Sequence, residues 1–225
     1  MTTTRTAAAA TARAAVAART EALFRQAGAL REGHFLLKSG RHSDRYLEKF
    51  LVLQYPAITS ELCAMLAGFG RDADGRPTVD LVAGPTTGGI ILAFETARQL
   101  GVRGIFAEEV ADPAGGRTRR EFRRGFTIGA GERILLVDDI LTTGSSLVAM
   151  LPPIEAAGGG IVRTVVLVDR SGGQAAVEST GGQSYAVEAL WRLELPTWEA
   201  GEATCPRCAD GTPLHAPGSS GTTGP

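Results

Sequence analysis

The chain has 225 residues and a formal net charge of −1, with 44% hydrophobic and 21% charged residues. This composition is typical of a single globular domain with one large core, and it argues against a broad basic surface for nucleic acid. Three cysteines are too few for a disulfide scaffold, and no apolar run approaches the roughly 20 residues of a membrane span. We therefore expect a cytoplasmic protein without a membrane or nucleic-acid partner.

The N-terminal segment is rich in alanine and threonine and contains no acidic residue over residues 1–20. Its composition is like that of a mitochondrial presequence, but it lacks the apolar core of a secretion signal. We interpret residues 1–13 as a flexible extension. Apolar residues at helical spacing over residues 14–30 predict a helix, and a single domain is expected over residues 14–200.

The next segment is extended and apolar from Gly33 and turns polar around Gly40. Residues 46–53 predict a strand, and Pro56 predicts the start of a helix. Lys38 offers a cation to a carboxylated or phosphorylated ligand, although the same residues suit an ordinary polar turn. Tyr46 suits either stacking on a flat base or a place in the core.

From residue 80 onward, predicted strands alternate with predicted helices. This pattern indicates an α/β fold with a mostly parallel central sheet that is covered by helices on both faces. In such a sheet, ligands bind beyond the carboxyl ends of the strands, so the loops there should meet at one cleft. The predicted strands are 80–84, 104–108, 133–138, 161–168 and 186–195, and the predicted helices are 89–100 and the segment after Gly144.

The loop over residues 84–89 is built of small residues, Gly-Pro-Thr-Thr-Gly-Gly. Such a loop lets backbone N–H groups approach an anion, and Thr87 and Gly88 are its candidate pyrophosphate-binding residues. A tight turn without a ligand would have the same composition.

Residues 134–146 combine a buried strand, two carboxylates and a hydroxyl-rich turn that leads into a helix. Backbone N–H groups at a helix N-terminus bind phosphate, while carboxylates accept from ribose hydroxyls or face a metal ion carried with pyrophosphate. A phosphorylated aspartate or simple helix capping would also fit the two acids. The candidate residues for a phosphorylated sugar are Asp138, Asp139, Ile140, Leu141, Thr142, Thr143, Gly144, Ser145 and Ser146.

Two further segments carry charged residues where loops are expected. Arg170 follows a predicted strand, and its guanidinium suits a carboxylate or a uracil-like edge, with Asp169 expected to orient it; a surface ion pair is the alternative. Residues 108–125 form a long polar loop, which suggests a lid, a solvated loop or a basic patch for another partner. Its arginines are Arg117, Arg119, Arg120, Arg123 and Arg124.

Near the C-terminus, Cys205 and Cys208 have the spacing of a metal-binding knuckle, with His215 nearby. A complete zinc site needs a second pair of ligands, and Cys63 is distant on a predicted helix. The alternatives are zinc binding, including a site shared between subunits, and an inert or redox-labile pair. Residues 201–225 are expected to form a tail that is partly disordered.

These segments together resemble the type I phosphoribosyltransferases, which bind 5-phosphoribosyl 1-pyrophosphate, and residues 134–146 are similar to their signature. The motif Lys-Ser-Gly-Arg-His-Ser at residues 38–43 and the Asp169-Arg170 pair further resemble orotate phosphoribosyltransferases. The resemblance covers residues 30–195. It implies the type I phosphoribosyltransferase fold, with an N-terminal hood at about 30–55 and a flap at about 108–125.

The resemblance also implies an activity, which is transfer of the phosphoribosyl group to orotate in pyrimidine synthesis. Lys38, Asp138 and Asp139 would be catalytic, with Lys38 also contacting the donor, and Thr142, Arg170 and Tyr46 would bind orotate. Mg²⁺ would arrive with the donor without a direct protein ligand, and a homodimer would place each flap over the adjacent site.

Two features depart from the resemblance. The flap lacks the lysine and histidine usual in orotate phosphoribosyltransferases, and Gly88 stands where some relatives have a lysine. A phosphoribosyltransferase for a purine or uracil therefore remains an alternative. A non-catalytic regulator that senses the donor and binds nucleic acid is another.

Overall fold

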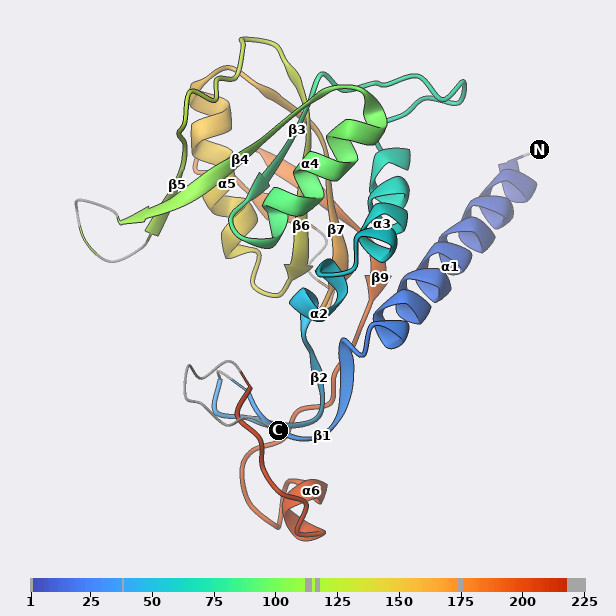
Figure 1. Ribbon diagram of the computed structural model, residues 1–225, viewed down its shortest axis with the longest axis vertical. Coiled ribbons are helices and arrows are strands. Elements are labelled where there is room, and N and C mark those ends of the chain that lie inside the picture. The colour runs from blue at the N-terminus through green and yellow to red at the C-terminus, as the bar shows by residue number, and fades with distance from the viewer. Residues whose placement is uncertain (1, 38, 112–114, 116–117, 174–175, 218–225) are drawn as a thin grey trace.

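In the computed structural model, a seven-stranded sheet forms the body of the protein (Figure 1). The structure describes the whole chain except residues 1, 38, 112–114, 116–117, 174–175 and 218–225. The strand order is β5-β4-β3-β6-β7-β9-β8, and the five inner strands are parallel while β5 and β8 pair antiparallel at the edges. The predicted α/β fold with a mostly parallel sheet is therefore confirmed.

The helices and strands follow one another in the expected alternating order. The strands of the sheet are β3 (Leu81–Pro85), β4 (Arg103–Ala111), β5 (Thr118–Phe122), β6 (Arg133–Leu141), β7 (Gly160–Asp169), β8 (Ala176–Glu178) and β9 (Ser184–Arg192). The helices are α1 (Thr2–Gln26), α2 (Lys49–Leu53), α3 (Pro56–Gly68), α4 (Gly88–Leu100), α5 (Ser145–Ala156) and α6 (Pro206–Ala209). A separate two-stranded sheet pairs β1 (Leu30–Leu36) with β2 (His42–Leu47).

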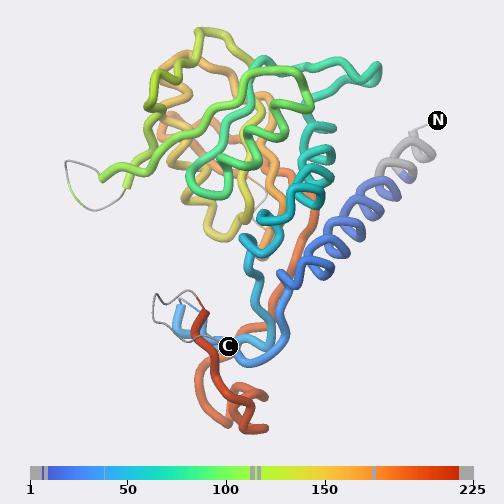
Figure 2. Tube along the Cα trace, in the orientation of Figure 1, coloured from blue at the N-terminus to red at the C-terminus, as the bar shows by residue number. Residues whose placement is uncertain are grey.

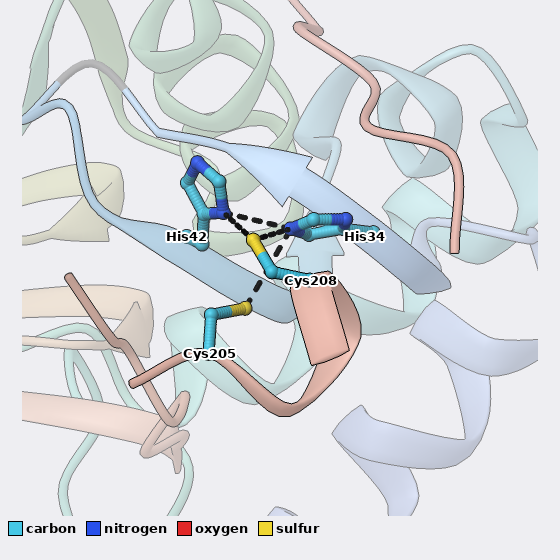
Figure 3. Close-up of side chains that lie close together, drawn as sticks. All are labelled: His34, His42, Cys205 and Cys208. Atoms are coloured by element: carbon cyan, nitrogen blue, oxygen red, sulfur yellow. Dashed lines mark hydrogen bonds between the residues drawn. The ribbon is translucent and has the colours of Figure 1, made fainter. Parts of the chain in front are cut away.

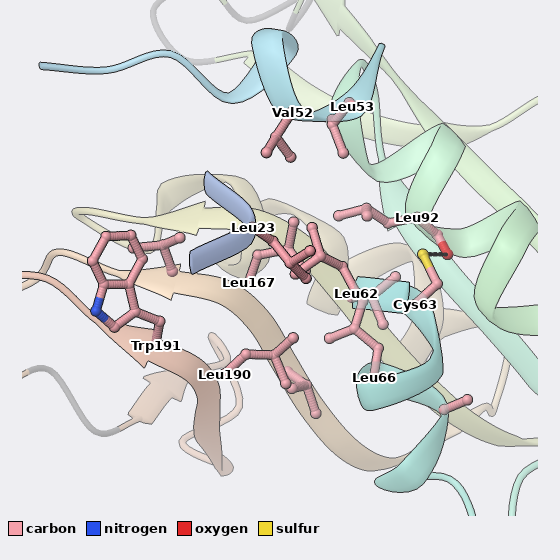
Figure 4. Close-up of a cluster of buried hydrophobic side chains, with 14 of the residues drawn as sticks. Leu23, Val52, Leu53, Leu62, Cys63, Leu66, Leu92, Leu167, Leu190 and Trp191 are labelled. Atoms are coloured by element: carbon pink, nitrogen blue, oxygen red, sulfur yellow. Dashed lines mark hydrogen bonds between the residues drawn. The ribbon is translucent and has the colours of Figure 1, made fainter. Parts of the chain in front are cut away.

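Strand β6 is apolar on both faces because each face is covered by helices. Leu135 and Val137 join the core formed with α1, α3 and α4, whereas Ile134 and Leu136 join the core beneath α5. Figure 4 shows the larger core, where Leu62 and Leu66 of α3 approach β7 and β9. Burial of each such side chain contributes about 1.5–3 kcal/mol. This packing holds the end of β6, and the acids there, in one place.

Three predicted element boundaries differ from the structure. Helix α1 begins at Thr2 instead of near residue 14, in keeping with the high helix propensity of its alanines. The strand predicted over residues 46–53 ends at Leu47, and the apolar residues after it form α2. Finally, the long loop predicted over residues 108–125 contains the end of β4 and all of β5, which pair with each other, and Phe122 packs against the core beneath α5.

The C-terminal segment lies along the β1–β2 hairpin, which is the main part of the hood expected at about 30–55 and is called the hood from here on (residues 30–37 and 39–47). Backbone hydrogen bonds join Leu36 to His215, His215 to His34, and His42 to Trp198 in both directions. Figure 2 shows this segment beside the hood, beyond the edge of the sheet at which β6 ends. Residues 201–217 of the predicted tail are held by the hood, which supplies hydrogen-bond partners that the sequence pattern did not reveal, and residues 218–225 lie outside the described residues.

A search of the described residues finds no helix long and apolar enough to cross a membrane.

Candidate active site

Two buried carboxylates, Asp138 and Asp139, lie at the carboxyl end of β6 and are 6% and 4% exposed. Asp138 Oδ1 accepts from the backbone N–H of Asp139, and Asp139 Oδ1 accepts from that of Ile140. Lys49, the first residue of α2, places its Nζ 2.7 Å from Asp139 Oδ2. The acids are therefore fixed by the backbone and by one cation beneath the hood.

Burial raises the pKa of Asp138, and repulsion from Asp139 raises it further. The backbone hydrogen bond from Asp139 and the positive charges of Lys49 and Arg120 oppose this rise. Buried carboxylates of this kind gain from hydrogen-bond donors or cations brought by a ligand. The pair is therefore suited to ribose hydroxyls or to a metal ion that arrives with a substrate.

The β3–α4 loop packs directly against Asp139. A Cβ atom on Gly88 would lie 2.0 Å from Asp139 Oδ2, so any side chain larger than hydrogen would displace the carboxylate. Gly84 and Gly89 also touch, since a Cβ on Gly84 would lie 2.5 Å from the Gly89 carbonyl oxygen. The Thr86–Thr87 peptide bond in this loop is cis. Small residues are thus required here to bring the loop against the acids.

The hydroxyl-rich turn follows the acids and leads into α5. Gly144 precedes the helix with a positive φ of 73°, and among the described residues no side chain caps the helix N-terminus. Thr142, Thr143 and Ser145 are exposed, and a small hollow is lined by this turn together with Asp138. Free N–H groups and hydroxyls at a helix start form a phosphate-binding arrangement.

Arg170 follows β7 and is half-buried. Burial lowers the pKa of its guanidinium, and Nε has no hydrogen-bond partner among the described residues. The hydroxyl of Tyr46, on β2, is electrostatically coupled to Arg170, and burial raises the pKa of that hydroxyl. A buried donor without a partner is costly, so it fits a site completed by a ligand oxygen.

Arg120, on β5, donates hydrogen bonds to Thr86 of the β3–α4 loop. Its side chain is 8% exposed, its Nη1 donates to Thr86 Oγ1 at 2.7 Å, and its Nη2 lies 3.0 Å from a Glu109 carboxylate oxygen. The guanidinium is thus tied to the loop that touches Asp139.

Comparison with known proteins identifies the family. The model of the phosphoribosyl transferase domain matches residues 53–193. Orotate phosphoribosyltransferase of Caldicellulosiruptor saccharolyticus is 40% identical over 197 residues, covering 88% of this chain and 94% of its own. That of Acidithiobacillus ferrooxidans is 41% identical over 201 residues, covering 89% and 95%. The chain belongs to the orotate phosphoribosyltransferase family.

Solved phosphoribosyltransferases share the fold at lower identity. The orotate phosphoribosyltransferase of Aeropyrum pernix has a TM-score of 0.58 at 24% identity, covering 77% of this chain and 93% of its own. An adenine phosphoribosyltransferase from Leishmania tarentolae has a TM-score of 0.53 at 17% identity, covering 74% and 84%. Because enzymes named for different bases share it, the fold does not select the base.

For this member of the family, the structure gathers most of the predicted site residues but not all. Residues 138–146, Thr87, Gly88, Tyr46 and Arg170 lie at the carboxyl edge of the sheet or face it from the hood. Lys38 and Arg117 lie outside the described residues. Asp169 does not hold Arg170: its carboxylate accepts from the backbone N–H and hydroxyl of Ser171 and lies 3.6 Å from Arg192.

The remaining flap arginines form ion pairs along the β4–β5 hairpin. Arg119 and Arg123 lie within 3 Å of Glu121, and Arg124 lies 2.6 Å from Glu108. These three side chains are more than half exposed, in contrast to Arg120. Their contribution to stability is small, because exposed ion pairs are weak.

Near the two acids, the contacts of Lys49 with Asp139 and of Arg120 with the β3–α4 loop could not be predicted from the sequence. Lys49 lies within a segment that the sequence predicts as a strand. That prediction does not indicate that its side chain contacts β6. Arg120 is one of five arginines in a segment that the sequence predicts as a loop. Only the alternation of side chains along a strand at residues 118–122 would indicate that it faces inward.

We predict that Asp138→Asn stabilises the ligand-free protein more strongly at about pH 8 than at about pH 5. Folding raises the pKa of this carboxyl above its unfolded value of about 3.9, so the proton it holds favours the folded state at low pH. That contribution is lost as the pH rises through the raised folded pKa, and asparagine avoids the loss. Urea unfolding at both pH values measures the difference.

Asp80→Asn provides the control for this measurement. Arg133 lowers the pKa of Asp80 to about 2, so the control should change stability equally at both pH values. An Asp138→Asn effect that is the same at both pH values would contradict the prediction.

Proposed function

We propose that this chain transfers the phosphoribosyl group from 5-phosphoribosyl 1-pyrophosphate to N1 of orotate. The products are orotidine 5′-monophosphate and pyrophosphate, as a step of pyrimidine nucleotide synthesis. The observation that carries the proposal is the meeting of three groups at one edge of the sheet: the Asp138–Asp139 pair, the α5 N-terminus and Arg170 Nε, which has no hydrogen-bond partner within the described part of the chain. Two relatives named orotate phosphoribosyltransferase, at 40% and 41% identity over nearly their full length, support the choice of base.

The donor is bound by the carboxyl end of β6 and the turn that follows. Residues 142–146 bind the 5′-phosphate through backbone N–H groups and hydroxyls. Asp138 and Asp139 accept hydrogen bonds from the ribose hydroxyls. Cleavage of the C1–O bond develops positive charge on the ribose ring, and the two nearby carboxylates stabilise that charge. Their role is electrostatic, since orotate can arrive as an anion that needs no base.

The base is bound between the hood and β7. Arg170 donates to the orotate carboxylate or to its uracil-like edge, which removes the cost of the partnerless Nε. Tyr46 flanks the base from β2, and Thr142 supplies a hydroxyl. Lys38 neutralises charge on the reacting ligands.

The donor set at the acids fits Mg²⁺ carried by the pyrophosphate. Two buried carboxylates, one with a raised pKa, favour an incoming hard cation, and Lys49 lies beside Asp139 Oδ2 without making a hydrogen bond to it. When bound, Mg²⁺ supplies charge neutralisation for the pyrophosphate. No side chain is assigned to it as a direct ligand.

The same proposal includes a cytoplasmic homodimer. Strands β4 and β5 pair at the edge of the sheet (Figure 1), and we propose that this hairpin covers the site of a neighbouring subunit. Its arginines would then face the pyrophosphate of that site, and closure would keep water from the ribose cation.

A base panel tests the proposal. The purified protein is incubated with 5-phosphoribosyl 1-pyrophosphate and Mg²⁺ and with orotate, uracil, hypoxanthine or adenine in turn. We expect pyrophosphate release with orotate, and less than about a hundredth of that rate with the other bases, because they leave Arg170 without its carboxylate partner. Consumption of another base in preference to orotate contradicts the substrate assignment. Tight donor binding without turnover of any base would favour a regulator.

A further inference from the structure

Four metal-binding side chains from distant parts of the sequence meet beside the hood. They are His34 on β1, His42 on β2, and Cys205 and Cys208 around α6. Their donor atoms all lie within 4.8 Å of one another, and Figure 3 shows them pointing toward a common centre. His34, His42 and Cys205 are buried, and Cys208 is half-buried.

Three of the separations between these donor atoms fall in the range of a tetrahedral metal site. Zinc–nitrogen and zinc–sulfur bond lengths place neighbouring ligand atoms about 3.3–3.8 Å apart. Cys205 Sγ lies 3.6 Å from His34 Nε2, and Cys208 Sγ lies 3.8 Å from the same atom and 3.3 Å from His42 Nδ1. The two histidine nitrogens are closer, at 2.7 Å, so one ring would move by about half an ångström to admit the ion.

Hydrogen bonding sets the tautomer of His34. Its Nδ1 lies 2.8 Å from the carbonyl oxygen of Thr212, which can only accept, so Nδ1 carries the proton. Nε2 therefore presents a lone pair to the centre of the cluster. A carbonyl partner on the outer nitrogen is the usual support of a metal-binding histidine.

The cysteines are arranged as ligands and not as a disulfide. Both are free thiols, and they stand on a single helical turn in which the backbone N–H of Cys208 bonds to the carbonyl oxygen of Cys205. The Cys-x-x-Cys spacing places both sulfurs on the side of the two histidines. A redox dithiol needs no such pair of imidazoles, whereas a metal site does.

We propose that His34 Nε2, His42 Nδ1, Cys205 Sγ and Cys208 Sγ bind one structural zinc ion. Two thiolates and two imidazoles in a tetrahedral arrangement are a preferred donor set of zinc. The site uses four protein ligands, so it has no open position for a substrate. Binding releases the two thiol protons to solvent, and neither sulfur is oxidised.

The ion would join the C-terminal segment to the hood. A two-stranded sheet without a core of its own is marginally stable, and the hood gains its partners from residues 196–215. Arg41, at the hood turn, also donates to the Thr197 carbonyl oxygen. Because Tyr46 continues β2 from His42, the zinc would also hold the base side of the proposed active site.

Metal content tests the proposal without reference to turnover. Protein purified in reducing buffer without chelator, or supplied with zinc, should contain about one zinc per chain, and the Cys205→Ser/Cys208→Ser variant should contain less than about a tenth of that. Cys63→Ser is the matched control, since Cys63 is a buried free thiol on α3 outside the cluster, and it should keep its zinc. Cobalt substitution should give the visible absorption of a tetrahedral thiolate site in the wild type and in the control only.

A chain that takes up no zinc with all three thiols reduced overturns the proposal. So does zinc that is retained when both cysteines are serine. Equal loss from Cys63→Ser would show that the metal does not depend on this cluster, and it would also contradict the assignment.

The linking role has its own readout. After zinc removal, amide hydrogen exchange over residues 30–47 and 196–215 should accelerate at least about tenfold, while β6 and α5 remain protected by the main core. Unchanged exchange in both segments would overturn the linking role. Because zinc content and exchange are measured without substrate, this result is separable from the outcome of the base panel.

Discussion

The Asp138→Asn/Asp139→Asn variant should lose turnover by at least about a thousandfold while keeping its fold. Asparagine has the same shape as aspartate and still accepts from the backbone N–H groups of residues 139 and 140. The negative charge that opposes the growing positive charge of the ribose ring is lost. Rates of pyrophosphate release measure the effect, and circular dichroism checks the fold.

The stability of this variant separates a catalytic role from a structural one. The two acids repel each other in a buried place, so their removal should leave the midpoint of thermal unfolding unchanged or higher. Asp80→Asn is the matched control, because this acid precedes β3 at the opposite edge of the sheet and pairs with Arg133 at 2.6 Å. It should retain activity. Turnover at the wild-type rate in the double variant would remove Asp138 and Asp139 from the site.

The places of the two acids and of the hydroxyl-rich turn could be predicted because their signal is local. A buried strand, two carboxylates, a hydroxyl turn and a helix start all fall within residues 134–146, and each has a recognisable composition. The parallel sheet then fixes where these residues lie, since the carboxyl ends of neighbouring strands share one edge. The position of Arg170 could be predicted for the same reason, because it follows a predictable strand.

The metal cluster could not be predicted because its signal is not local. His34 and Cys208 meet only after the chain has returned past the whole sheet, and neither histidine has the spacing of a metal motif. The Cys205–Cys208 spacing indicates half of a site, and the sequence offers only the nearby His215 or a second subunit to complete it, whereas the structure completes it with His34 and His42. Hydrogen bonds between His42 and Trp198 bring the two halves together. No periodicity in either segment indicates that pairing.

The β4–β5 hairpin could not be predicted for a different reason. Its strands are rich in arginine and glutamate, which are uncommon in strands, so residues 108–125 were predicted as a loop. The opposite charges of Glu109 and Arg120 face each other across the two strands, Arg124 neutralises Glu108, and Phe122 packs on the core beneath α5, so these contacts outweigh propensity. The opposite difference occurs at Lys49. The apolar residues that follow it predict a strand, but in the structure they belong to helix α2.

Gly88→Ala should reduce turnover by about a hundredfold, because the added methyl group would lie 2.0 Å from Asp139 Oδ2. Either the Asp139 carboxylate moves away from Lys49 or the start of α4 moves. Each of these shifts would distort the proposed ribose site. Overpacking of this kind also costs about 1–3 kcal/mol of unfolding free energy. Gly68→Ala is the matched control, since no atom lies within 4 Å of its added methyl and it should keep full activity.

A double-mutant cycle shows whether the Gly88 effect acts through Asp139. In an Asp139→Ala background the carboxylate is gone, so Gly88→Ala should cost less than about threefold further in turnover. Effects that instead multiply would mean that Gly88 is needed for the path of the loop itself and not for the position of the acid. That result would contradict the steric account, because the close contact that Gly88 makes with Asp139 would then have no consequence for the reaction.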